Sequence, residues 1–111
     1  MTIELMRQLN LPIDVSVSLP DVILYSPEGQ TLLVIEAVVS SGPVTLERLA
    51  QLHKLTAGSV SLGVQTVYIS AFPSRRVFRK FVEDIAWGSS VWIVDEPYNI
   101  IHFVTLSPGG V

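Results

Sequence analysis

Alternating and continuous apolar stretches divide the first third of the chain into strands. In residues 13–17 apolar and polar side chains alternate, which is the period of a half-buried strand. Pro20 ends that stretch, residues 21–25 predict a second strand, and residues 26–29 have the composition of a tight turn. Residues 31–39 are apolar on both faces, as expected of a central strand that is covered on both sides. The pattern predicts a hairpin whose second strand is buried.

Helical spacing of apolar residues indicates three helices. Residues 1–9 predict a short helix that ends before Pro12. Thr45 is a good N-cap for a helix running to about residue 56, where residues 57–58 (Ala-Gly) predict its end. Ser74 caps another amphipathic helix, with these inward-facing positions: Val77, Phe78, Phe81, Val82 and Ile85.

Three more strands, over residues 66–70, 91–94 and 100–104, complete the pattern. The order of elements becomes α-β-β-β-α-β-α-β-β, which predicts an α/β fold with a mixed sheet flanked by helices. At 111 residues the chain fits one domain spanning residues 1–111.

Composition excludes several classes of protein. With 49% hydrophobic and 15% charged residues the chain is not disordered, and its apolar runs are far shorter than the ~20 residues of a membrane span. It has no cysteine, so disulfides and thiolate metal sites are excluded and a cytoplasmic location is expected. A net charge of −3 argues against a general polyanion binder, and any contact with nucleic acid requires a local basic patch.

Asp21 and Glu36 are the main candidates for chemistry. Antiparallel pairing of the predicted hairpin can bring both carboxylates to one end of the sheet. A carboxylate on an apolar strand requires a compensating cation, and Mg²⁺ prefers such hard oxygen ligands. Alternatively, an arginine or backbone donors neutralise the pair in a purely structural role. The spacing alone favours the structural role, since ion pairs also perturb buried carboxylates.

Several sequence blocks occur in a fixed order along the chain. The blocks are residues 19–25 (LPDVILY), 33–38 (LVIEAV), 40 (S), 42–44 (GPV), 71–73 (AFP), 78–81 (FRKF), 84–87 (DIAW), 91–93 (VWI), 96–97 (EP) and 101–103 (IHF). Together they resemble the catalytic domain of the BsuBI/PstI type II restriction endonucleases over about residues 11 to 103. That family belongs to the PD-(D/E)XK nuclease superfamily, whose core is αβββαβ, in agreement with the predicted order.

The resemblance implies a metal-dependent DNA endonuclease of a restriction-modification system. Asp21 and Glu36 would hold Mg²⁺, with Mn²⁺ as an alternative, and double-stranded DNA would be cut by a homodimer. The superfamily usually carries a lysine two residues after the glutamate, where this chain has Val38. Its role would pass to the polar face of the following helix, where Arg48, Gln51 or Lys54 could substitute. Of these, Arg48 and Gln51 are the expected catalytic residues.

A basic stripe of four residues, Arg75, Arg76, Arg79 and Lys80, is the candidate DNA-binding surface. A solvated helix face is the alternative interpretation of such a stripe. Two rival functions also stay open. The chain could be a catalytically impaired DNA-binding module on the nuclease fold, or an oligomerisation domain.

Overall fold

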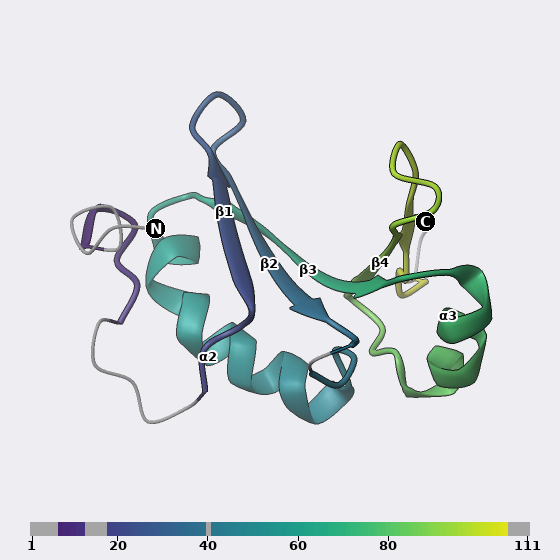
Figure 1. The fold of residues 1–111 in the computed structure, drawn as a ribbon. Helices are drawn as coiled ribbons and strands as arrows, with labels where there is room; N and C mark the ends of the chain where they lie inside the picture. Colours follow the sequence, from purple (N-terminus) through teal and green to yellow (C-terminus); the bar gives the residue numbers. More distant parts are fainter. Residues whose placement is uncertain (1–6, 13–17, 40, 107–111) are drawn as a thin grey trace.

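The computed structural model describes residues 7–12, 18–39 and 41–106 of the chain, which form a five-stranded sheet with helices (Figure 1). The sheet has the strand order β1-β2-β3-β4-β5. Strands β2, β3 and β4 are parallel, and the two outer pairs are antiparallel. The elements are β1 (Val22–Ser26), β2 (Thr31–Ala37), α2 (Leu46–Ser61), β3 (Gln65–Phe72), α3 (Arg75–Phe81), the 3-10 helix η1 (Val82–Asp84), β4 (Ser90–Ile93) and β5 (Ile100–His102).

This architecture confirms the predicted α/β class with a mixed sheet. The described elements follow the expected order β-β-α-β-α-β-β. The strand predicted over residues 13–17 lies outside the described residues, as do residues 1–6 of the first predicted helix, whose Arg7 and Gln8 are helical. No helix in the described ranges is long and apolar enough to cross a membrane.

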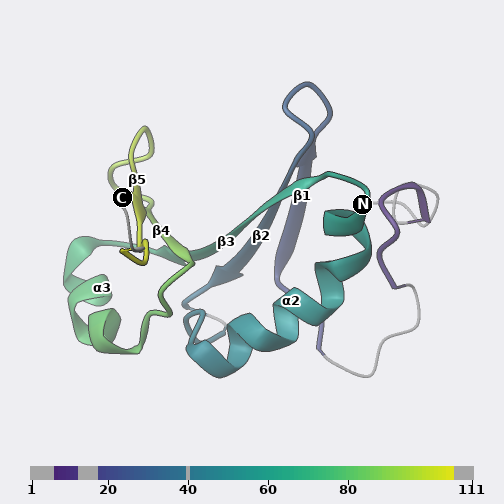
Figure 2. The same cartoon turned by 180° about the vertical axis from the view of Figure 1, so that it is seen from behind.

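Helices α2 and α3 pack on the same face of the sheet, as the two views in Figures 1 and 2 show. Val34 and Tyr68 belong to the core cluster under α2. Phe72 lies four residues after Tyr68 on β3 and therefore on the same face of the sheet. Its ring packs against Phe78 of α3 at a ring-centroid distance of 5.3 Å. The connections β2-α2-β3 and β3-α3-β4 are both right-handed crossovers between parallel strands, and both step across the sheet in the same direction. They therefore place α2 and α3 on one side of the sheet.

The opposite face of the sheet carries no helix in the described part of the chain. This face is apolar, and we call it the open face. Its residues are Leu24, Leu33, Ile35, Ile69, Trp92 and Ile100. The expectation that β2 is covered on both sides is therefore wrong for these residues. Both faces of β2 carry apolar side chains. The sequence pattern therefore does not show which face a helix covers.

Helix α2 is longer than its sequence predicts. Thr45 caps it as expected, accepting a hydrogen bond from the Arg48 amide, but the helix continues through Gly58 to Ser61. Gly58 is instead a point of close approach, because a Cβ there would collide with the carbonyl oxygen of Asn10. The turn that ends the helix contains Gly63, whose φ of +84° glycine adopts readily.

Other boundaries also differ from the predictions. Strand β3 spans Gln65–Phe72 rather than 66–70, β4 spans Ser90–Ile93 rather than 91–94, and β5 spans Ile100–His102 rather than 100–104. Strand β2 ends at Ala37 rather than Val39. Helix α3 begins after its Ser74 cap as predicted but ends at Phe81, and the chain tightens into η1. Val82, expected to face inward, is therefore 40% exposed, whereas Ile85 is buried as predicted.

Candidate functional site

The carboxyl edge of the parallel strands collects the candidate site residues. Glu36 lies near the end of β2, level with Ser70 of β3. Strand β1 runs antiparallel to β2 with Val22 opposite Ile35, which brings Asp21 beside Glu36. Because α2 starts after β2, its first turn returns to the same edge with Arg48. Ligand sites of open α/β sheets lie at this edge.

Asp21 is exposed, and its carboxylate is held in place by two donors. Its Oδ2 accepts a hydrogen bond from the Ala37 amide at 2.8 Å, and its Oδ1 accepts one from Ser41 Oγ at 3.1 Å. The backbone amide of Asp21 in turn donates to the Glu36 carboxylate, which lowers the pKa of that group. The two carboxyl-bearing residues are therefore direct neighbours.

Glu36 is buried, with 3% of its surface exposed, and forms an ion pair with Arg48. Both Nε and Nη2 of Arg48 contact Glu36 Oε1, at 2.7 and 2.6 Å. Arg48 Nη1 donates to Gln51 Oε1 at 3.0 Å, so Gln51 fixes the guanidinium on the helix. Asp21, Glu36, Arg48 and Gln51, the four residues expected to be catalytic, thus form one connected cluster.

The pKa of Glu36 is raised above its usual value of 4.5. Burial is the largest cause, because removal from water disfavours the charged form. The hydrogen bonds and charge of Arg48 act in the opposite direction, and the negative charge of Asp21 raises the pKa further. A cation placed between the two carboxylates would relieve that repulsion.

An open pocket of about 510 Å³ lies beside this cluster and is lined in part by Glu36, Ser41 and Arg48. Glu36 is the carboxylate in the pocket lining, and Asp21 lies next to it, held by Ser41 of the same lining. This pair of carboxylates fits Mg²⁺, which prefers hard oxygen ligands and retains several waters. Among the described residues no group of three or more His, Cys, Asp or Glu side chains could hold a metal ion. The described protein ligands of such an ion are therefore limited to this carboxylate pair and neighbouring oxygens.

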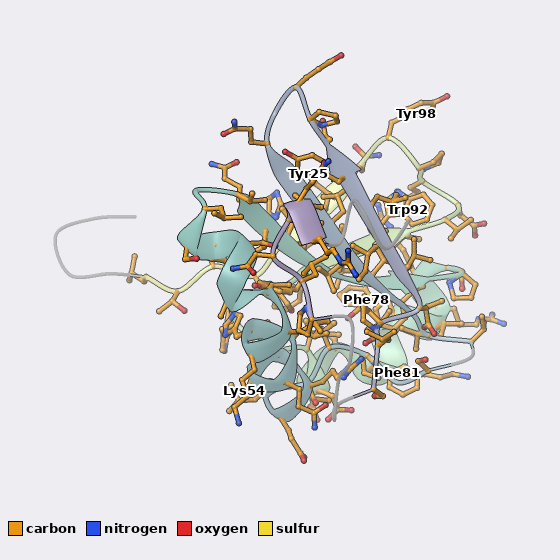
Figure 3. All side chains as sticks on the ribbon, turned by 90° about the vertical axis from the view of Figure 1, so that its left-hand side faces the viewer. Tyr25, Lys54, Phe78, Phe81, Trp92 and Tyr98 are labelled. Atoms are coloured by element: carbon orange, nitrogen blue, oxygen red, sulfur yellow. The ribbon has the colours of Figure 1, made fainter. Side chains whose placement is uncertain are left out.

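Val38 occupies the position where the superfamily usually has lysine, and it packs against an apolar cluster that contains Phe72 and Ile85. Its side chain cannot take part in acid–base chemistry. Lys54, a third candidate on α2, is exposed and points away from the sheet (Figure 3). Among the described residues, Arg48 contacts Glu36, and Gln51 contacts Arg48.

Two serines support the site, and the sequence pattern did not single them out for this role. Ser41 donates to Asp21, and the fully buried Ser70 accepts a hydrogen bond from the Val44 amide at 2.8 Å. The Val44 carbonyl accepts from the Ala86 amide at 3.0 Å. These bonds hold the loop before α2 in place. The sequence signal for this role was a single serine, Ser70, on the strand position level with Glu36.

The basic stripe begins at the same carboxyl edge, because α3 follows β3. Arg76, Arg79 and Lys80 are exposed. Arg75 is also exposed but forms a bidentate ion pair with Glu96, in which its Nη2 lies 2.6 Å from Oε1. This pair lowers the pKa of Glu96. Glu96 therefore partly neutralises Arg75.

Comparisons with known proteins found a matching family model and similar enzymes. A family model described as the BsuBI/PstI restriction endonuclease domain matches residues 1–105. The chain is 44% identical over 100 residues to the type II restriction enzyme BsuBI of Bacillus subtilis, covering 90% of this chain and 31% of that enzyme. It is 30% identical over 84 residues to the type II restriction enzyme AplI of Arthrospira platensis, covering 76% and 25%.

A solved structure shares the fold. The structure of SdaI restriction endonuclease superposes with a TM-score of 0.79 and 30% sequence identity, covering 94% of this chain and 33% of that one. The chain thus spans a quarter to a third of the length of these relatives.

Proposed function

The chain belongs to the BsuBI/PstI restriction endonuclease family, and on that premise we propose that it is a metal-dependent DNA endonuclease domain. Its reaction is the hydrolysis of a phosphodiester bond in double-stranded DNA. One observation carries the proposal: Asp21, directly before β1, and Glu36 of β2 meet at the carboxyl edge of the sheet beside an open pocket.

Asp21 and Glu36 are the proposed ligands of one Mg²⁺ or Mn²⁺ ion. When bound, the ion would supply Lewis-acid polarisation of the scissile phosphate and an acidified water. The hydrogen bonds from Ala37 and Ser41 orient Asp21 toward the pocket edge, and burial keeps the Glu36 carboxylate poorly hydrated. Poor hydration makes a second cation beside Arg48 favourable for that carboxylate.

Arg48 is the proposed catalytic cation. Its guanidinium stays protonated, so it binds phosphate oxygens and stabilises negative charge but does not accept a proton. Gln51 positions it through the bond to Nη1. Nη2 contacts Glu36, and a rotation about the last side-chain torsions exchanges that contact for a phosphate oxygen.

Arg76, Arg79 and Lys80 are the proposed phosphate contacts outside the site, with Arg75 contributing less because Glu96 pairs with it. Such contacts add affinity without sequence information. A homodimer would enlarge this surface and deliver a second active site to the opposite DNA strand.

A plasmid-nicking assay with Mg²⁺ or Mn²⁺ tests the proposal. We expect the parent chain to convert supercoiled plasmid to nicked or linear DNA, and Glu36→Gln to lower the rate by about 100-fold or more. Glu28→Gln, which removes an exposed carboxylate in the turn between β1 and β2, is the matched control and should leave the rate unchanged. Equal rates for the parent and Glu36→Gln would reject the assignment.

The second candidate function is a catalytically impaired DNA-binding or oligomerisation module. It is favoured by Val38, whose apolar contacts replace the usual lysine, and by the pairing of Glu36 with Arg48. For this candidate the chain would retard DNA in a gel at low salt, or self-associate, while showing no metal-dependent nicking.

A further inference from the structure

Val44 anchors the loop between β2 and α2 in the interior of the domain. Residues 41–45 form one wall of the pocket beside Glu36. Within this range Val44 alone is fully buried, and its neighbours are half-buried or exposed. The loop therefore has one point at which the interior fixes its position.

Two hydrogen bonds from separate parts of the chain hold Val44. Its amide donates to Ser70 Oγ of β3 at 2.8 Å, and its carbonyl accepts from the Ala86 amide at 3.0 Å. Both Val44 and Ser70 are fully buried. A buried amide that loses its acceptor has no water to replace it, so the bond from Val44 to Ser70 is costly to remove.

The two ends of the same loop position the residues of the candidate site. At one end Ser41 Oγ donates to Asp21 Oδ1 at 3.1 Å. At the other end Thr45 begins α2, and its Oγ1 accepts from the Arg48 amide at 3.2 Å. Because Arg48 is in the first turn, the point at which α2 begins determines where its guanidinium meets Glu36.

Ser70 is a polar residue at a position where the strand itself needs none. It lies on β3 between Ile69 and Ala71, level with Glu36. Burying a hydroxyl costs free energy unless it is hydrogen-bonded, and a small apolar side chain would carry no such cost. The amide of Val44 supplies the bond. The hydroxyl of Ser70 therefore serves the loop rather than the strand.

We propose that Ser70 is a positioning residue for the candidate site. By fixing Val44 it sets the positions of Asp21 and Arg48, and it acts through the loop rather than by touching metal or DNA. Side chains that orient metal ligands from behind typically change metal affinity by about 10–100-fold. The effect on affinity rests on the proposed metal site, whereas the effect on the loop needs no metal.

Hydrogen exchange of the metal-free chain tests the effect on the loop. The reporters are the amides of Ser41, which donates to the Ala37 carbonyl, and of Arg48. Ser70→Ala should speed exchange at both by about tenfold or more, because the loop loses its buried anchor. Ser70→Cys keeps nearly the same volume but accepts a hydrogen bond weakly, so its rates should lie between those of the parent and Ser70→Ala.

Ser59→Ala is the matched control. Ser59 is also fully buried, and its Oγ donates to the Leu9 carbonyl from the last turn of α2. It lies about three helical turns beyond Arg48. The variant removes one buried hydrogen bond without touching the loop. Thermal stability should therefore fall in both Ser59→Ala and Ser70→Ala, but exchange at Ser41 and Arg48 should stay at the parent rate in Ser59→Ala.

Isothermal titration with Mn²⁺ tests the consequence for the site. Ser70→Ala should bind Mn²⁺ about tenfold or more weakly than the parent, and Ser59→Ala should bind it equally well. A parent chain that binds no Mn²⁺ would reject the metal ligands of the proposed function, while faster exchange in Ser70→Ala would still support the positioning of the loop.

Three results would overturn the role of Ser70. One is exchange at Ser41 and Arg48 that Ser70→Ala leaves unchanged. Another is equal acceleration by Ser59→Ala, because the effect would then come from general loss of stability. The third is Mn²⁺ binding by the parent that Ser70→Ala does not weaken.

Discussion

Arg48 holds the buried carboxylate of Glu36 through two nitrogens on a single oxygen, at 2.7 and 2.6 Å. The contact joins the end of a central strand to the first turn of α2. One oxygen of Glu36 carries the ion pair, and the negative charge of Asp21 raises the pKa of the same carboxyl group.

Arg48→Ala should destabilise the fold by about 3 kcal/mol at neutral pH, because it leaves an uncompensated buried charge on Glu36. The free energy of unfolding from urea titrations measures this. The double variant Arg48→Ala, Glu36→Gln should recover most of the loss, since no buried charge is left unpaired. A double variant no more stable than Arg48→Ala would show that the loss comes from packing instead.

Glu36 gives stability a specific pH dependence. Its pKa is raised in the folded chain, so protonation favours the folded state. The contribution of Glu36 to the unfolding free energy is therefore fully present below 4.5, its usual pKa, and is lost as the pH rises through the folded-state pKa. The unfolding free energy of the parent minus that of Glu36→Gln should fall across this window, and a difference that rises with pH would contradict the assignment.

Gly58→Ala should destabilise the chain by about 1–3 kcal/mol, although alanine is the better helix former. The added Cβ collides with the Asn10 backbone, which must shift. Thermal or urea unfolding measures the change. Gly42→Ala, where a Cβ meets nothing within 4 Å, is the matched control and should be near neutral.

The basic stripe should contribute unequally to DNA affinity. Replacing Arg79 or Lys80 by alanine should weaken binding to any duplex sequence and reduce the slope of log affinity against log salt by about one. Arg75→Ala should have a smaller effect on both quantities, because Glu96 already neutralises that cation. Fluorescence anisotropy at several salt concentrations measures both, and equal slopes for all variants would exclude the stripe from the interface.

Local signals in the sequence predict much of the fold correctly. The Thr45 and Ser74 caps, the hairpin between β1 and β2, and the α/β order follow from side-chain chemistry within a few residues. The errors arise where distant contacts decide. Gly58 lies inside a helix at a point where a Cβ would collide with Asn10, and neither residue reveals the other in the sequence.

The candidate site shows the same division. Asp21 and Glu36 could be paired from strand register alone, and Arg48 from its helix position. The structure shows that Arg48 rather than Lys54 reaches Glu36, and that Ser41 and Ser70 support the loop. Those contacts depend on which face of α2 turns toward the end of β2. The spacing of apolar residues predicts that face only to within one helical turn.

The central claim is that Asp21 and Glu36 share one divalent cation. Isothermal titration of the parent chain with Mn²⁺ at neutral pH, compared with Asp21→Asn and Glu36→Gln, tests it most directly. We predict one bound ion per chain, with affinity reduced at least tenfold in each variant and unchanged in Glu28→Gln. Mn²⁺ binding of equal strength in the parent and both site variants would contradict the account.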